Sequence, residues 1–394
     1  MKTNSVVVTG LGVATPIGLG IDPFWENLMR GASGVSPVSV IDTSDFDVRT
    51  GAEIKGFSNA SGDRTTALAI RATHLALEDA DIKPAEIYGA NVAVIMGTSC
   101  GNQESVERIN EATLQGHQPS SHDIRNLTDD NISVSVTKRY SLTGPSLVIP
   151  TACSSGNHAI ALGYDLIRSG RTSLALVGGA DSISRILFTV FNRLQSLSPD
   201  VCRPFDSRRQ GIVIGEGAGV LVLEPLEWAL TRRARIYAQV LGYGLACDIS
   251  GPTAPGPEGA GVIEAIRRMS QTYDVDLSSI DYISAHGTGT QLNDTIEVTA
   301  MKKLFGHGFK IPMSSIKSMV GHTMGAASAL EAAACCMAIK TGLVPPTINY
   351  GVPDPACDID PVPNIARAHK VRVAISNAFA FGGSIGVVAF GEIR

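Results

Sequence analysis

Short runs of β-branched and aliphatic residues alternate with longer helical stretches along the whole chain. This alternation is typical of an α/β protein whose strands are buried on both faces. In the first half, strands are expected at Ser5–Thr9, Val92–Met96, Leu174–Gly178 and Val220–Leu223, and helices at Pro23–Met29, Arg64–Ala80 and Gly156–Ser169. In the second half, strands are expected at Arg235–Gly242, Asp281–Ala285, Ile311–Ser314, Val371–Asn377 and Ile385–Phe390, and helices at Gly261–Thr272, Thr295–Phe305 and Gly325–Lys340.

The length of the chain predicts two halves that pack closely together. A chain of 394 residues with 44% hydrophobic positions exceeds the roughly 250–300 residues that one core usually supports. We place the boundary near residue 240, which gives an N-terminal half of residues 1–240 and a C-terminal half of residues 241–394. In type and order, the run Ser146–Pro150, Cys153 and the helix Gly156–Ser169 match Ile311–Ser315, a polar turn and the helix Gly325–Lys340, as in a duplicated unit.

Composition and charge exclude several classes of protein. The formal net charge of −5 and the lack of a dense Lys/Arg run give no global field for binding nucleic acid. The seven cysteines form no CxxC pattern, so we expect a reduced, cytoplasmic setting and neither a disulfide framework nor a metal site. The most apolar long stretch, Ala326–Val344, contains Glu331 and Lys340, so we expect a buried helix there and no membrane span.

The segment Pro150–Gly156 places a cysteine where a buried strand ends and an apolar helix begins. At that helix N-terminus Cys153 lies at the positive end of the helix dipole, which favours the thiolate and predicts a nucleophile. The neighbouring backbone N–H groups can also hold an oxyanion. A small, buried structural cysteine is the alternative interpretation.

Two histidines and a glycine-rich turn also follow predicted strands. His286 lies in the loop Ser284–Thr290 just past a buried strand, and His322 lies in the turn before the Ala-rich helix. Open α/β sheets bind their ligands at such strand ends, so the geometry allows a site shared with Cys153. The glycines of Ser376–Ser384 allow the backbone to approach a ligand closely. Taken alone, each feature also has a structural explanation, as a hydrogen-bonding histidine or a tight apolar turn.

In this order, the four segments resemble the β-ketoacyl-acyl carrier protein synthases, which are elongating Cys-His-His ketosynthases of the thiolase superfamily. The similarity runs from Val6 to Phe390, and further matching stretches are Arg203–Asp206, Gly215–Gly219 and Val344–Asn349. The resemblance implies a thiolase-like α/β fold in which two pseudo-repeated halves form α-β-α-β-α layers. It also implies a decarboxylative Claisen condensation of malonyl-acyl carrier protein with an acyl group on the cysteine, which gives a β-ketoacyl product.

The resemblance also implies roles for individual residues. Cys153 would carry the acyl group, and His286 and His322 would bind the malonyl thioester carbonyl and stabilise the enolate formed when CO2 leaves. Lys317, paired with Glu331, would support the active site with its charge. Phe381 would contribute its backbone N–H to the oxyanion hole and act as a gate. Substrate would be bound by Thr253, Thr288, Thr290 and Phe379. Loop capping is the alternative role for the threonines. No cofactor is implied beyond the phosphopantetheine arm of an acyl carrier protein, which would be the partner.

Several positions depart from the common fatty-acid enzymes. The usual Gly-Gly-Thr-Asn is Gly-Gly-Ser-Ile at 382–385, which removes an amide that normally braces the loop, and Ala380 replaces a glycine, which we expect to restrict the gate. The segment Ser58–Thr66 is shorter and less basic, and so resembles ketosynthases of bacterial type II polyketide or aryl-polyene systems. Ser120 and Ser121 replace a basic pair near the carrier-protein entrance, so docking would use other cations, for which we choose Arg64, Arg125 and Arg193.

Two other functions compete with this interpretation. A thiolase would need a second cysteine in the segment Asn377–Ser384, which has none. A non-catalytic, chain-length-factor-like subunit, which shapes the acyl tunnel of a partner, commonly lacks the nucleophile that Cys153 supplies here. Ketosynthases of this type form a homodimer or a heterodimer with such a homologue, and the sequence leaves both open. Cys100 and Phe191 either line the acyl pocket or an interface, or make ordinary core contacts.

Overall fold

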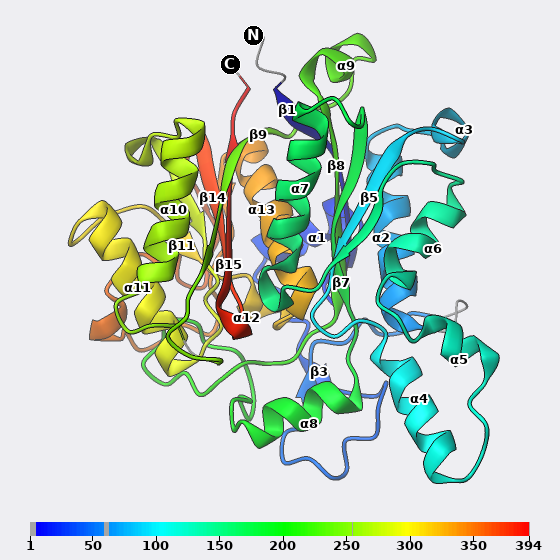
Figure 1. Ribbon diagram of the computed structural model, residues 1–394. Coiled ribbons are helices and arrows are strands. Elements are labelled where there is room, and N and C mark those ends of the chain that lie inside the picture. The colour runs from blue at the N-terminus through cyan, green and yellow to red at the C-terminus, as the bar shows by residue number, and fades with distance from the viewer. Residues whose placement is uncertain (1–4, 59–62, 254, 394) are drawn as a thin grey trace.

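The computed structural model describes residues 5–58, 63–253 and 255–393 (Figure 1). Within these ranges the chain forms one sheet of eleven strands and two small two-stranded sheets. The small sheets pair β3 (Ser36–Pro37) with β4 (Thr50–Gly51) and β12 (Leu343–Val344) with β13 (Arg367–Ala368). The main sheet runs in the order β11 (Met313–Ser314), β10 (Tyr282–Ser284), β14 (Val373–Phe379), β15 (Ser384–Gly391), β9 (Ala238–Cys247), β1 (Val6–Thr15), β8 (Gly217–Pro225), β7 (Leu174–Asp181), β5 (Val92–Gly97) and β6 (Ser146–Ile149), with β2 (Gly18–Leu19) paired to β1.

The two parts of the main sheet have the same succession of antiparallel and parallel strand pairs. In the N-terminal part β1 and β8 are antiparallel, β8 and β7 are antiparallel, and β7, β5 and β6 are parallel. In the C-terminal part β9, β15, β14, β10 and β11 pair with the same succession of directions. Strands β1 and β9 pair antiparallel and join the two parts. Residue 240 lies inside β9, and the division of the chain at that residue stays a prediction.

Helices form three layers around the two parts of the sheet (Figure 1). In the middle layer α7 (Ser155–Arg168) and α13 (Ala327–Thr341) pack against each other between the two parts. On the outside, α2 (Arg64–Asp79) and α6 (Asn131–Arg139) cover the N-terminal part. On the opposite side, α10 (Ala260–Tyr273) covers the C-terminal part and carries α11 (Gln291–Phe305). The predicted α-β-α-β-α order of layers is confirmed.

The middle helices contain small residues because they are covered on every side. Every residue of α13 from Ala327 to Ala338 is buried. A Cβ atom at Gly156 on α7 would lie 2.6 Å from the amide nitrogen of Ala329, so the two backbones approach closely. The 3-10 turns that precede these helices, η1 (Ala152–Ser154) and η3 (Met324–Ala326), consequently contact each other.

The helices missed by the sequence analysis lie mainly at the periphery. In α4 (Gln103–Leu114) the only buried residue is Ser105, so the apolar period that marks a core helix is absent. The predicted helix near Pro23 is α1 (Ile21–Met29). The other missed helices are α3 (Pro84–Ile87), α5 (Ser121–Asn126), α6, α8 (Arg185–Arg193), α9 (Leu226–Thr231) and the short α12 (Lys317–Val320).

Glycines extend the first strand beyond its predicted end at Thr9. All ten residues of β1 are buried, and a Cβ atom at Gly12 would lie 1.9 Å from the carbonyl oxygen of Ala72 on α2. The missing side chain therefore allows the helix to lie directly on the strand. Part of the shortened segment Ser58–Thr66, residues 59–62, lies outside the described residues. In the described part of the chain, no helix has both the length and the hydropathy needed to span a bilayer.

Candidate active site

Cys153 lies in a strained turn between β6 and α7. Ala152 in this turn has a φ of 50°, in the left-handed region that side chains disfavour. The Ser155 hydroxyl donates a hydrogen bond to the Thr98 carbonyl at 2.9 Å and accepts one from the Thr151 N–H at 3.0 Å. These contacts fix the turn, and they hold the Cys153 side chain in the wall of a cavity with the residue 9% exposed.

Burial opposes ionisation of the Cys153 thiol. Burial raises the pKa of Cys153 to about 12, although the charge of Lys317 opposes the rise, and Asp181 and Glu331 add to it. The helix N-terminus is expected to favour the thiolate, and this loss of hydration acts in the opposite direction.

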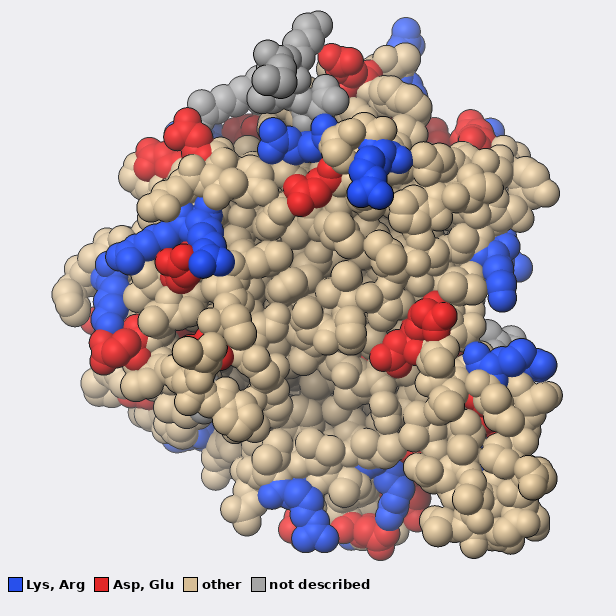
Figure 2. All heavy atoms as spheres, viewed as in Figure 1, with Lys and Arg blue, Asp and Glu red and all other residues tan. Residues whose placement is uncertain are grey.

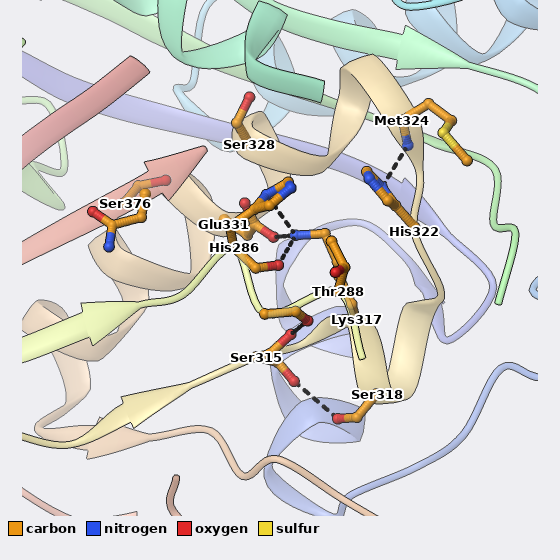
Figure 3. Close-up of polar contacts among 12 residues, drawn as sticks. His286, Thr288, Ser315, Lys317, Ser318, His322, Met324, Ser328, Glu331 and Ser376 are labelled. Carbon is orange, nitrogen blue, oxygen red and sulfur yellow. Dashed lines mark hydrogen bonds and ion pairs between the residues drawn. The ribbon is translucent and has the colours of Figure 1, made fainter. Parts of the chain in front are cut away.

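His286 follows β10 and is held through its own backbone. Its N–H and that of Gly287 donate to the Glu297 carboxylate at 2.9 and 2.8 Å. Its carbonyl accepts from the Lys317 ammonium at 2.6 Å, and its Nδ1 lies 3.5 Å from the same ammonium (Figure 3). An ammonium group only donates, so Nδ1 is the acceptor and the neutral ring carries its proton on Nε2.

His322 reaches the same tautomer through a different contact. The Met324 N–H donates to its Nδ1 at 3.2 Å (Figure 3), so the proton of the neutral ring is again on Nε2. The backbone N–H of His322 donates to the Val213 carbonyl at 2.7 Å, which fixes the turn against the N-terminal half. The His286 and His322 rings lie edge to face with their centroids 5.6 Å apart.

Both imidazoles are neutral hydrogen-bond donors. Burial lowers the pKa of His286 and of His322 well below 6.5, and the charge of Lys317 lowers both pKa values further. Lys317 forms an ion pair with Glu331, and both of these side chains are 1% exposed. The ion pair holds the Lys317 ammonium beside the imidazoles, and the positive charge of that ammonium opposes their protonation (Figure 3).

One cavity of about 380 Å³ brings together residues from both halves of the chain. The predicted site residues in its wall are Cys153, His286, His322, Thr253, Thr288, Thr290, Phe379 and Phe381. Lys317 and Glu331 lie behind this wall, where Lys317 contacts His286. The hydroxyls of Thr288 and Thr290 hydrogen bond to each other at 3.0 Å. The structure therefore places the whole predicted set around one space.

Phe381 stands on a turn at the edge of the cavity, and its side chain is 43% exposed. The Gly382 N–H donates to the Pro252 carbonyl at 2.7 Å, and the Asp248 N–H donates to the Gly383 carbonyl at 2.8 Å. The turn is therefore clamped to the loop 248–253 by backbone hydrogen bonds. This clamp does not use the amide side chain that the sequence lacks at 385.

The structure agrees with only some of the residues predicted to line the acyl tunnel or to dock a carrier protein. Phe191 lines the cavity. Cys100 is outside the described cavity wall, but it packs against the apolar cluster that contains Phe191 and the cavity residue Ile212. Arg125 and Arg193 are exposed. Arg64 is wrong as a docking residue, because its side chain is buried and its Nε donates to the Glu216 carboxylate at 2.7 Å.

Two buried carboxylates that the sequence analysis missed hold the site together. Besides the N–H groups at His286 and the next residue, Glu297 accepts a hydrogen bond from the Asn377 side-chain amide at 3.2 Å. Asp181 connects the end of β5 with the turn before α13, through the Thr98 hydroxyl and the backbone N–H groups of Ser99, Cys100 and Gly325. In the sequence each is an isolated acid whose partners are distant, so no local pattern reveals it.

Comparisons with known sequences identify the family of the chain. Residues 3–229 match the family described as "Beta-ketoacyl synthase, N-terminal domain", and residues 237–351 match "Beta-ketoacyl synthase, C-terminal domain". The chain is 38% identical to Nodulation protein E of Rhizobium meliloti, over 98% of this chain and 99% of that protein. It is 36% identical to 3-oxoacyl-[acyl-carrier-protein] synthase 2 of Synechocystis sp., over 99% of this chain and 98% of that protein.

Solved structures support the same assignment. The ishigamide ketosynthase/chain length factor is 38% identical, with a TM-score of 0.96 and full coverage of both chains. AntDE:AntF, described as a type II PKS acyl-carrier protein in complex with its ketosynthase bound to the hexaketide, is 31% identical, with a TM-score of 0.94 and full coverage of both chains. The predicted ketosynthase resemblance and its thiolase-like α/β fold are confirmed. The chain belongs to the beta-ketoacyl synthase family.

Proposed function

We propose that this protein is a β-ketoacyl-acyl carrier protein synthase that joins a malonyl unit to an acyl group carried on Cys153. The observation that carries the proposal is one cavity wall formed by a thiol and two neutral imidazoles, those of His286 and His322. Both rings have the proton on Nε2, so they supply two N–H donors of the kind that a developing enolate needs.

The first step transfers an acyl group to Cys153. The sulfur attacks the carbonyl carbon of an acyl thioester, a new C–S bond forms, and the bond to the pantetheine sulfur breaks. The proton lost by the thiol leaves on the pantetheine sulfur, so the exchange is neutral overall. We assign stabilisation of the oxyanion formed in this step to the backbone N–H groups of Cys153 and Phe381.

The second step removes CO2 from a malonyl thioester. The electron pair of the breaking C–C bond moves onto the thioester oxygen, to which the N–H groups of His286 and His322 donate. The enolate carbon then attacks the acyl carbon on Cys153, and the C–S bond breaks. The β-ketoacyl thioester leaves, and the Cys153 thiolate takes up a proton from solvent, so one proton is consumed for each CO2 released. Cys153, His286 and His322 are buried, which limits the access of water that would otherwise protonate the enolate.

The variant Cys153→Ala separates the two chemical steps. We expect it to lose acyl transfer and condensation, because the attacking sulfur is gone. Decarboxylation continues, because both histidines remain. The measurements are CO2 release from labelled malonyl-acyl carrier protein and chromatography of the β-ketoacyl product. Cys336→Ala, a change of a buried cysteine on α13 outside the described cavity wall, is the matched control. Undiminished elongation by Cys153→Ala would refute the assignment.

We further propose that acyl and malonyl groups arrive on the phosphopantetheine arm of an acyl carrier protein. The hydroxyls of Thr253, Thr288 and Thr290 line the cavity and offer hydrogen bonds along a narrow path for the arm. Arg125 and Arg193 are exposed cations available to an acidic carrier protein. On the face shown in Figure 2, charged side chains of both signs lie mainly around the rim, and the centre is largely uncharged. This pattern favours docking through a few cations rather than a broad basic field.

We also propose that the protein works beside a second ketosynthase-like chain, either a copy of itself or a chain-length-factor homologue. Strand β6 ends the main sheet, and Leu147 on it is 42% exposed. Such edge strands readily pair with another chain. Light scattering of the protein, expressed with and without the homologue, distinguishes the two assemblies. Similar proteins are named both as polyketide ketosynthases and as 3-oxoacyl-[acyl-carrier-protein] synthases, so their names do not assign a pathway. The acyl group that is transferred to Cys153 from a panel of acyl-carrier-protein thioesters would assign it.

A further inference from the structure

His158 on α7 connects the turn of Cys153 with the turn of Phe381. Its Nδ1 lies 3.0 Å from the carbonyl oxygen of Ser154, and its Nε2 lies 3.3 Å from the hydroxyl oxygen of Ser384. A carbonyl only accepts hydrogen bonds, so Nδ1 carries the ring proton and Nε2 accepts from the hydroxyl. Burial lowers the pKa of His158, which keeps the ring in the neutral form that this arrangement requires.

Ser384 closes the turn that carries Phe381. Its carbonyl accepts from the Ala380 N–H at 2.9 Å, and β15 begins at this residue. Between them, Gly382 and Gly383 have φ values of 79° and 78°. Glycines leave a backbone free to take several shapes, so the shape of this turn depends on outside contacts. Besides the backbone clamp to the loop 248–253, the hydrogen bond from the Ser384 hydroxyl joins this turn to α7.

The surroundings of His158 fix the direction of its ring. A Cβ atom at Gly386 would lie 3.0 Å from the Nδ1 of His158, so the glycine leaves room for the imidazole against β15. The neighbouring Asn157 side chain donates to the carbonyls of Gly386 at 2.9 Å and Ser376 at 3.0 Å. Helix α7 is therefore anchored to β14 and β15 right beside the ring. Because His158 is outside the described cavity wall, any effect on catalysis acts through other residues.

We propose that His158 is a positioning residue that sets the separation between the backbone N–H groups of Cys153 and Phe381. This inference rests on the proposed function, in which those two groups hold the oxyanion. The Cys153 N–H is in the turn that also contains the Ser154 carbonyl, to which His158 donates. The Phe381 N–H is in the turn that ends at Ser384, from which His158 accepts. Oxyanion donors act at about 2.7–3.1 Å, so a small shift of either turn weakens them. Decarboxylation relies on the histidine pair instead and does not need the bridge.

Ser384→Ala is the first test, because it removes only the hydroxyl. We expect the rate of Cys153 acylation to fall about tenfold, less than the 10²–10³ expected for loss of a donor. The KM for the acyl donor and decarboxylation by the unprimed enzyme stay close to wild type. Ser384→Thr keeps a hydroxyl and restores the rate. Ser169→Ala, which removes a hydroxyl bonded to the Asp165 carbonyl at the other end of α7, is the matched control and leaves acylation unchanged.

A double variant tests whether His158 and Ser384 act through one hydrogen bond. We expect His158→Gln combined with Ser384→Ala to acylate no more slowly than the slower single variant. Losses that multiply, or normal acylation by both single variants, would overturn the inference. Urea unfolding of each variant separates a changed rate from a changed fold. The proposed function fails on a different result, namely a wild-type protein that takes up no acyl group on Cys153.

Discussion

At the scale of residues, burial favours the uncharged form of each side chain that we propose to take part in the reaction. Cys153, His286 and His322 are all buried, and loss of hydration favours the uncharged form of each. The rings are therefore neutral hydrogen-bond donors, and burial opposes ionisation of the thiol. The fixed ion pair of Lys317 and Glu331 maintains this state from behind the rings.

Removal of either histidine tests the donor assignment. We expect His286→Ala and His322→Ala each to slow malonyl decarboxylation about 10²-fold or more, because each variant lacks one N–H that stabilises the enolate. Release of labelled CO2 under single-turnover conditions measures the step. A variant that keeps the wild-type rate would remove that histidine from the mechanism.

Glu297 gives the folded protein a pH-dependent stability. Burial raises the pKa of Glu297 from 4.5 to about 7, although the N–H groups of Gly287 and His286 oppose the rise. Between these two pH values the folded protein keeps a proton that the unfolded chain has released. The contribution of this group to the free energy of unfolding therefore falls as the pH rises through that window.

The variant Glu297→Gln removes this titration. We expect the slope of unfolding free energy against pH, between pH 4.5 and 7, to be less negative in Glu297→Gln than in the wild type. Urea unfolding at several pH values in this window gives both slopes. Identical slopes would show that Glu297 does not titrate there.

At the scale of elements, the close approach of α7 and α13 brings the two catalytic turns together. Gly156 permits that approach, and any side chain at this position would meet the Ala329 backbone. We expect Gly156→Ala to lower the free energy of unfolding by about 1–3 kcal/mol through overpacking, and to reduce condensation as the turns separate. Urea unfolding and product formation measure the two effects. Wild-type stability with wild-type activity would contradict this account of the helix contact.

An element or a residue role can be predicted from the sequence when the residues that determine it are close together in the chain. Buried strands and helices such as β5 and α2 carry strong apolar patterns, so their ranges were predicted within a residue or two. The positions of Cys153, His286 and His322 after predicted strands allow a shared site, whereas their roles come from the resemblance of their segments to the ketosynthases. Arg64 was misassigned because its partner, Glu216, is distant in the sequence. The hydrogen bond between His158 on α7 and Ser384 likewise joins residues 226 positions apart, so no local pattern reveals it.

At the scale of the whole molecule, the site lies where the turn before α7 meets the turn before α13, which occupy equivalent positions in the two parts of the main sheet. The turn of Cys153 precedes α7 after β6, and His322 precedes α13 after β11. These strands occupy corresponding places in the two parts of the main sheet. The duplication therefore explains why a thiol from one half faces an imidazole from the other across one cavity.

The intact mass of the protein after incubation with acyl-carrier-protein thioesters tests the central claim most directly. We predict an added acyl mass that requires Cys153, is absent in Cys153→Ala, and disappears when malonyl-acyl carrier protein is added, as a β-ketoacyl product extended by two carbons forms. An adduct that persists in Cys153→Ala, or one that malonyl-acyl carrier protein does not consume, would contradict the account.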